Sequence, residues 1–96
     1  MRLNATEIKT IVQTAQEIFG PEVSVYLFGS RIDDTKRGGD IDLLVCTPYG
    51  KQSVLDRVLM KTRLKMRLGD QKIDIVGGDE DSPVVRTALD TGIRLV

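Results

Sequence analysis

The stretch LFGSRIDDTKRGGDIDLLV, residues 27–45, decides the fold of this chain. It opens at the end of VSVYLF (residues 23–28), whose β-branched and aromatic residues predict a strand. Residues 33–39 are polar and end in two glycines, which is typical of a loop. Residues 40–46, DIDLLVC, predict a second strand. The stretch therefore predicts two strands joined by a polar loop.

The flanking sequence completes an α/β (α+β) fold class. Apolar residues recur at helical spacing on both sides of the stretch, and two further β-branched runs follow it. These patterns predict helices at residues 4–19, 53–68 and 83–91, and strands at 72–76 and 93–96, the last as an edge strand. We expect one domain over residues 1–96, a small mixed β-sheet with helices packed on it, and an active site at one open sheet edge.

Composition excludes several classes of protein. The chain has 96 residues, 14 Lys plus Arg, 14 Asp plus Glu, no histidine and the single cysteine Cys46. Ser-His triads, His-ligated zinc and intramolecular disulfides are therefore excluded, and Cys46 fits a small apolar residue better than a nucleophile. No run reaches the ~20 apolar residues of a membrane span, so we expect a cytoplasmic location. The balanced charge gives no strongly basic groove for a nucleic-acid template.

Two aspartates, Asp40 and Asp42, open the second predicted strand. Residues i and i+2 of a strand point to the same side, so these carboxylates lie together. Mg²⁺ prefers such oxygen ligands, completed by substrate phosphates, and two-ion sites carry out phosphoryl and nucleotidyl transfer. The pattern alone is weak, because Asp79-Glu80-Asp81 repeats it. We interpret that second copy as a solvated loop, because Gly-Gly and Ser-Pro flank it.

Gly29 and Ser30 follow the first predicted strand directly. A glycine there lets backbone approach a ligand, and the serine hydroxyl can donate to a phosphate oxygen. The alternative is a plain turn with Ser30 as a helix cap. Arg31 adjoins Ser30 and is the best placed cation to contact a triphosphate. Asp74, in the middle of KIDIV (residues 72–76), is either a third ligand or general base, or a solvent-facing residue salt-bridged to Lys72 or Arg31.

The order strand, Gly-Ser, loop, Asp-x-Asp, helix and strand with a third aspartate resembles the polymerase-β-like nucleotidyltransferase superfamily. Residues 27–45 are similar in particular to the minimal nucleotidyltransferases of bacteria and archaea. The resemblance implies that the Gly-Ser pair binds the triphosphate and that three carboxylates hold two Mg²⁺ ions. Carried over by motif, these roles fall on Gly29, Ser30, Asp40, Asp42 and Asp74.

The resemblance also implies a substrate and a partner. Members of this small class accompany a helical HEPN protein as a toxin–antitoxin pair, and some transfer AMP from ATP to a tyrosine of that partner. A small-molecule nucleotidyltransferase and a non-catalytic binding antitoxin remain as alternatives. The short chain favours a partner that supplies the missing binding surfaces. We expect the apolar face of residues 53–68, marked by Val54, Leu55, Val58 and Leu59, to contact that partner or a second copy.

Overall fold

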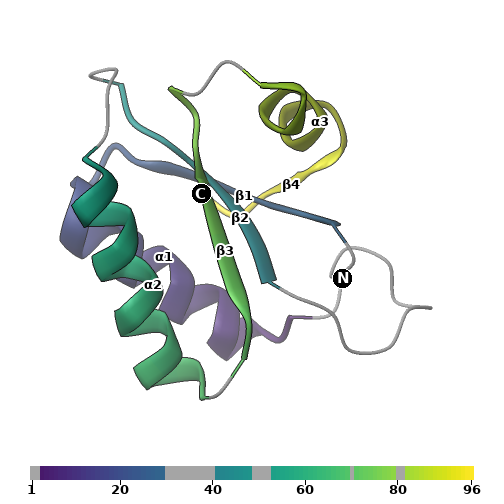
Figure 1. Ribbon diagram of the computed structural model, residues 1–96. Coiled ribbons are helices and arrows are strands. Elements are labelled where there is room, and N and C mark those ends of the chain that lie inside the picture. Colours follow the sequence, from purple (N-terminus) through teal and green to yellow (C-terminus); the bar gives the residue numbers. More distant parts are fainter. Residues whose placement is uncertain (1–2, 30–40, 49–52, 70, 80–81) are drawn as a thin grey trace.

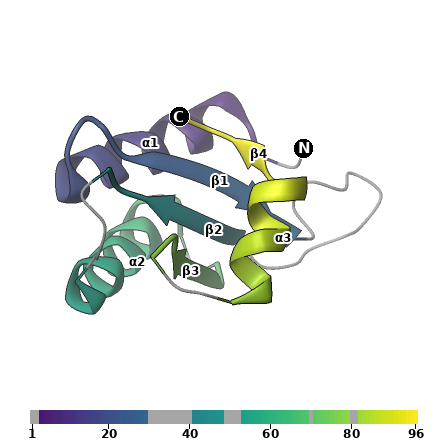
Figure 2. The same ribbon diagram turned by 90° about the horizontal axis from the view of Figure 1, so that it is seen from above.

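Two helices cover one face of a four-stranded sheet, and a third helix lies on the opposite face (Figures 1 and 2). The computed structural model describes residues 3–29, 41–48, 53–69, 71–79 and 82–96. In chain order the elements are α1 (Ala5–Phe19), β1 (Ser24–Phe28), β2 (Ile41–Cys46), α2 (Val54–Leu68), β3 (Ile73–Gly77), α3 (Pro83–Thr91) and β4 (Ile93–Arg94). Six of the seven elements lie within the predicted ranges, and β3 runs one residue past its predicted end, to Gly77.

The sheet is mixed, as predicted, with strand order β3-β2-β1-β4. Strand β2 runs antiparallel to β1 and parallel to β3, because α2 carries the chain back between β2 and β3. Strand β4 pairs with β1 antiparallel, with Leu27 opposite Ile93. The ladder continues past β4, since the Leu95 N–H donates to the Val25 carbonyl at 2.7 Å. Strands β3 and β4 are therefore the two edges.

Helix α1 begins where the sequence places a cap. The Asn4 side chain accepts from the Glu7 N–H at 2.8 Å, and the Glu7 carboxylate accepts from the Asn4 N–H at 3.0 Å. This reciprocal capping box satisfies two of the helix's first N–H groups. The helix ends at Gly20, whose φ of 98° suits a glycine far better than any other residue.

The core follows the alternation of the strands. On the face of the sheet that α1 and α2 cover, five strand side chains are fully buried. They are Val25, Leu27, Ile41, Leu43 and Val45. Alternate residues point to the other face, where Leu44 packs against Val85 and Ala88 of α3. Strands β1, β2 and β3 thus have one face toward the main core and one toward α3. Among the described residues, no helix is long and apolar enough to cross a membrane.

Helix α2 meets the core through Met60 and Leu64, which are fully buried. Its other apolar residues, Val54, Leu55, Val58 and Leu59, remain 63%, 78%, 54% and 40% exposed. They lie on a different face of the helix from Met60 and Leu64, so packing on the sheet and on α1 cannot cover them. The face expected from the sequence to contact a partner is thus a solvent-exposed apolar surface.

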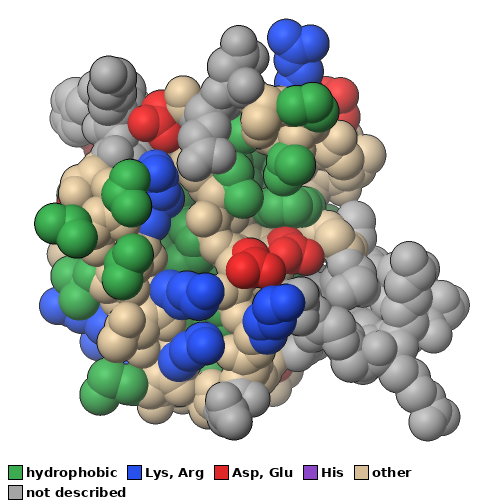
Figure 3. Space-filling view, in the orientation of Figure 1, with side chains coloured by type: hydrophobic (Ala, Val, Ile, Leu, Met, Phe, Trp, Pro, Cys, Tyr) green, Lys and Arg blue, Asp and Glu red, His purple; other side chains and the backbone are tan. Residues whose placement is uncertain are grey.

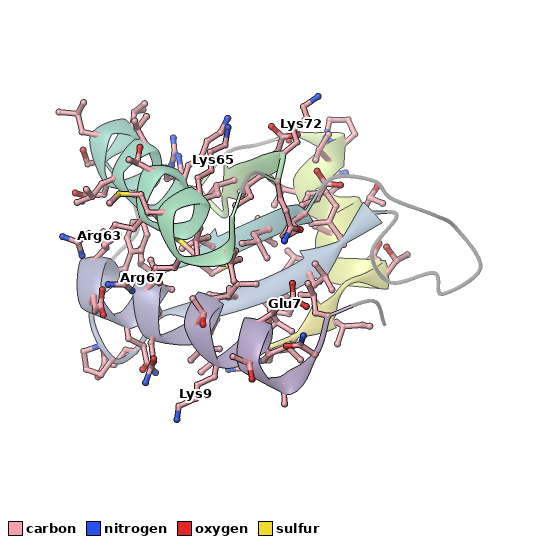
Figure 4. The ribbon with its side chains drawn as sticks, turned by 90° about the horizontal axis from the view of Figure 1, so that it is seen from below. Glu7, Lys9, Arg63, Lys65, Arg67 and Lys72 are labelled. Carbon is pink, nitrogen blue, oxygen red and sulfur yellow. The ribbon has the colours of Figure 1, made fainter. Side chains whose placement is uncertain are left out.

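Polar contacts fasten α2 to α1 along their shared side. Arg63 and Arg67 reach the Glu17 carboxylate at 3.3 and 3.0 Å, and the Arg67 guanidinium donates to the Thr14 hydroxyl at 2.7 Å (Figure 4). Thr14 is fully buried, and its own hydroxyl donates to the Thr10 carbonyl at 2.7 Å. A buried hydroxyl that both donates and accepts avoids the free energy cost of an unpaired polar group.

Candidate active site

Asp42 and Asp74 lie opposite each other on neighbouring strands. The parallel register of β2 and β3 pairs Asp42 with Asp74, and the antiparallel register of β1 and β2 pairs Phe28 with Asp42. Neighbouring strands are ~4.8 Å apart, so residues paired in this way are close neighbours on one face. The two carboxylates therefore form a row across the sheet, one on a central strand and one on an edge strand.

The row lies on the face of the sheet that carries α3, away from α1 and α2. On β2, Ile41 and Leu43 point into the main core, so Asp42 between them points to the opposite face. Asp42 and Asp74 are both half-buried. One residue further along β2 on this face, Leu44 is fully buried beneath α3. The carboxylates thus have buried apolar side chains on one side and solvent on the other.

Gly29 lies directly against Asp42. Its φ is 79°, in the region that residues with a side chain rarely adopt. A Cβ at this position would overlap the Asp42 Oδ2 and come within 3.2 Å of its Cγ. The backbone that ends β1 therefore passes over the Asp42 carboxylate at a distance that only glycine permits.

Gly29→Ala is expected to lose nucleotide binding, and Gly20→Ala is its matched control. Both glycines have positive φ, so either alanine should cost about 1–3 kcal/mol of folding free energy through backbone strain. At Gly20 a Cβ meets no atom within 4 Å, whereas at Gly29 it displaces Asp42. Thermal melts with and without Mg-ATP separate the two effects. Equal ATP-dependent increases in Tm for both variants would contradict a role of Gly29 in the site.

The remaining predicted site residues, Ser30, Arg31 and Asp40, lie outside the described residues. Within the described part of the chain, no three His, Cys, Asp or Glu side chains gather as a metal site. The donor chemistry nevertheless fits a hard divalent cation, because two carboxylates lie side by side on neighbouring strands. Their assignment as metal ligands therefore remains a prediction.

A groove of about 520 Å³ borders Asp74 on the outer side of β3. One stripe of α2, at helical spacing, forms one wall, and the edge strand forms the other. The lining residues are Val54, Arg57, Val58, Lys61, Asp74, Ile75 and Val76. The sequence did not predict this groove, because it arises from the angle at which α2 packs against β3.

Asp79 makes a contact that the sequence did not predict. It lies in an exposed turn, as expected for the solvated loop predicted at Asp79-Glu80-Asp81, and its side chain forms a 3.3 Å ion pair with Arg57 of α2. The two side chains are only 20% and 13% exposed. A Cβ at Gly77 would overlap the Arg57 guanidinium, so the glycine after the β-branched run provides space for this pair. Glu80 and Asp81 lie outside the described residues.

Cys46 is not a candidate nucleophile. Burial raises the pKa of its thiol above the ordinary value, and the positive charge of Arg94 offsets this only in part. A raised pKa leaves less thiolate at neutral pH and so a less reactive side chain. The interpretation of Cys46 as a half-buried packing residue is consistent with this environment.

Comparison with known proteins identifies the fold and the family. A family model described as nucleotidyltransferase domain matches residues 7–86. No curated protein sequence matches the chain. Among solved structures, a toxin–antitoxin complex with AMP-PNP contains a similar chain, with 26% identity and a TM-score of 0.73, over 98% of this chain and 73% of that one.

Two further structures share the fold. The MntA–HepT toxin–antitoxin complex matches with 21% identity and a TM-score of 0.74, over 97% of this chain and 72% of that one. The tri-AMPylated Shewanella oneidensis HEPN toxin in complex with its MNT antitoxin matches with 22% identity and a TM-score of 0.74, over 95% and 70%. The polymerase-β-like fold predicted from the sequence is thereby confirmed. The chain belongs to the nucleotidyltransferase domain family.

Proposed function

We propose that this nucleotidyltransferase moves AMP from ATP onto a hydroxyl of a partner protein, a helical HEPN-type toxin, and acts as the antitoxin of the pair in the cytoplasm. The observation that carries the proposal is the row of Asp42 and Asp74, with Gly29 against the first carboxylate. That arrangement supports the proposal that a phosphate-binding turn and a proton acceptor would act on one side of the sheet.

Each residue has a distinct part in the proposed reaction. Gly29, Ser30 and Arg31 would hold the triphosphate, and Asp40, Asp42 and Asp74 would hold two Mg²⁺ ions. Bound Mg²⁺ would supply charge neutralisation at the phosphates. The acceptor hydroxyl oxygen would form a bond to the α-phosphorus as the bond to pyrophosphate breaks. Asp74, directly or through water, would take the hydroxyl proton.

The similar structures support the substrate and the partner. One holds an AMP-PNP molecule, and another holds a HEPN toxin that carries AMP beside its antitoxin. The exposed apolar face of α2 gives this chain a surface for a partner of that kind. A second copy of the chain is the other occupant that this face would accept.

Intact-mass spectrometry tests the proposal. After incubation with this protein, ATP and Mg²⁺, a HEPN protein encoded beside it should gain the mass of one or more AMP groups, and EDTA should prevent the gain. A small-molecule nucleotidyltransferase would leave the HEPN protein unmodified and convert a low-molecular-weight acceptor instead. A binding antitoxin would neutralise its partner with no change of mass in either protein.

A further inference from the structure

The groove beside Asp74 lies between one stripe of α2 and the edge strand β3. Its α2 wall presents Val54 and Val58, which are 63% and 54% exposed. Figure 3 looks onto this side of the molecule and shows hydrophobic side chains over α2, then Lys and Arg side chains, then a pair of acidic side chains. Its volume of about 520 Å³ falls within the usual ~300–1,000 Å³ of ligand clefts.

The β3 wall is an edge of the mixed sheet, and β3 pairs with β2 in parallel. The Ile41 N–H donates to the Lys72 carbonyl at 2.9 Å, and the Gly78 N–H donates to the Val45 carbonyl at 2.8 Å. Alternate residues of a strand bond to the same neighbour, so Asp74 and Val76 between them also bond toward β2. The peptide groups of Ile73, Ile75 and Gly77 therefore point to the outer edge, where no described strand pairs with them.

An open edge of this kind can accept one more strand. Main-chain hydrogen bonds supply affinity in such β-augmentation, and alternate side chains supply specificity. A segment paired with β3 would run past Asp74 and would bring every second side chain to the face that carries the carboxylates. A hydroxyl-bearing side chain at one of those positions would reach Asp74 without any further element of this chain.

Lysine side chains border the α2 side of the groove, although the whole chain is neutral. Lys61 lines the groove and has no ion pair among the described residues, whereas Arg57 is paired with Asp79. Lys65 and Lys72 flank it and point away from α1, on the β3 side (Figure 4). Acidic residues on either side of the hydroxyl would complement these cations.

We propose that the groove between α2 and the edge of β3 binds an extended, acidic segment of the acceptor protein as an added strand, and so places the acceptor hydroxyl at Asp74. This inference rests on the proposed function and names the acceptor surface of the same site. The exposed valines of α2 would pack against apolar side chains of the segment, and Lys61 would pair with one of its carboxylates.

Two synthetic heptapeptides test the inference. Each has a central tyrosine between two valines and then two alanines, with glutamates at both ends in one peptide and lysines in the other. In an added strand the valines and the end charges would lie on the α2 side and the tyrosine on the Asp74 side. The acidic peptide should bind the protein more tightly by fluorescence anisotropy. Lys61→Glu should weaken its binding about tenfold, since one attractive charge pair becomes repulsive. Lys9→Glu, on the far side of α1, is the matched control and should leave binding unchanged (Figure 4).

N-methylation separates strand addition from charge attraction alone. Methyl groups on alternate peptide nitrogens should abolish binding in one register and leave it intact in the other, because only every second N–H would pair with β3. Equal loss in Lys61→Glu and Lys9→Glu, equal binding of both registers, or no saturable binding of either peptide would overturn the inference. So would dimerisation of the free protein that Lys61→Glu abolishes, since a second copy would then fill the groove.

A transfer assay keeps this inference distinct from the proposed function. With Mg-ATP, the acidic peptide and the small acceptor N-acetyl-tyrosinamide should both gain AMP. Lys61→Glu should lower kcat/KM only for the peptide, because the small acceptor does not fill the groove. Peptide binding as predicted, with no AMP on either acceptor, would refute the proposed function and leave the docking groove in place.

Discussion

Asp74→Asn is expected to lower the rate of AMP transfer to the partner by a factor of at least ~10²–10⁴. Asparagine keeps the shape of the side chain but cannot accept the hydroxyl proton. The substitution should mainly raise the free energy of the transition state, so affinity for the partner should stay nearly unchanged. The measurement is single-turnover transfer from labelled ATP, with complex formation followed in parallel by size-exclusion chromatography.

Asp90→Asn provides the matched control for this prediction. Asp90 is an exposed residue of α3, so the substitution removes one negative charge from the surface without touching the row of carboxylates. It should leave both transfer and binding unchanged. A similar rate for Asp74→Asn and the native protein would exclude Asp74 as proton acceptor, and loss of the complex would assign it to the binding surface.

The sequence predicted the elements well because their signals are local. The capping box of Asn4 and Glu7 involves residues three apart, and the period of two along β2 puts Asp42 on one face without any knowledge of its neighbours. The pairing of Asp42 with Asp74 could not be predicted in the same way. It depends on the register between β2 and β3. That register is set by how the connecting helix α2 packs against the sheet.

Long-range contacts account for what sequence reasoning missed. The pair of Arg57 and Asp79 joins a helix to a turn 22 residues later, so the acidic loop had no visible partner in the sequence. The groove depends likewise on which stripe of α2 meets β3. A helix with apolar residues on two faces gives no local signal for the face that is buried, and here Met60 and Leu64 are buried while Val54 and Val58 are exposed.

Asp42→Asn is expected to abolish the stabilisation of the protein by Mg-ATP. A ligand at 100 times its Kd raises the free energy of unfolding by about 2.7 kcal/mol. In a domain of this size, each 1 kcal/mol corresponds to roughly 4–8 °C in Tm. The native protein should therefore gain on the order of 10–20 °C, while the variant, with one carboxylate fewer for the cation, should gain almost none. Differential scanning calorimetry measures both.

The same variant should stay folded without the ligand. Asparagine keeps the size and shape of the Asp42 side chain and one of its acceptor oxygens, so in EDTA the variant should still unfold in a single cooperative transition. Asp90→Asn should keep the full Mg-ATP shift. A variant that is less stable in EDTA yet gains as much from Mg-ATP as the native protein would make Asp42 a structural residue, because a ligand of the cation must lower the Mg-ATP shift when its charge is removed.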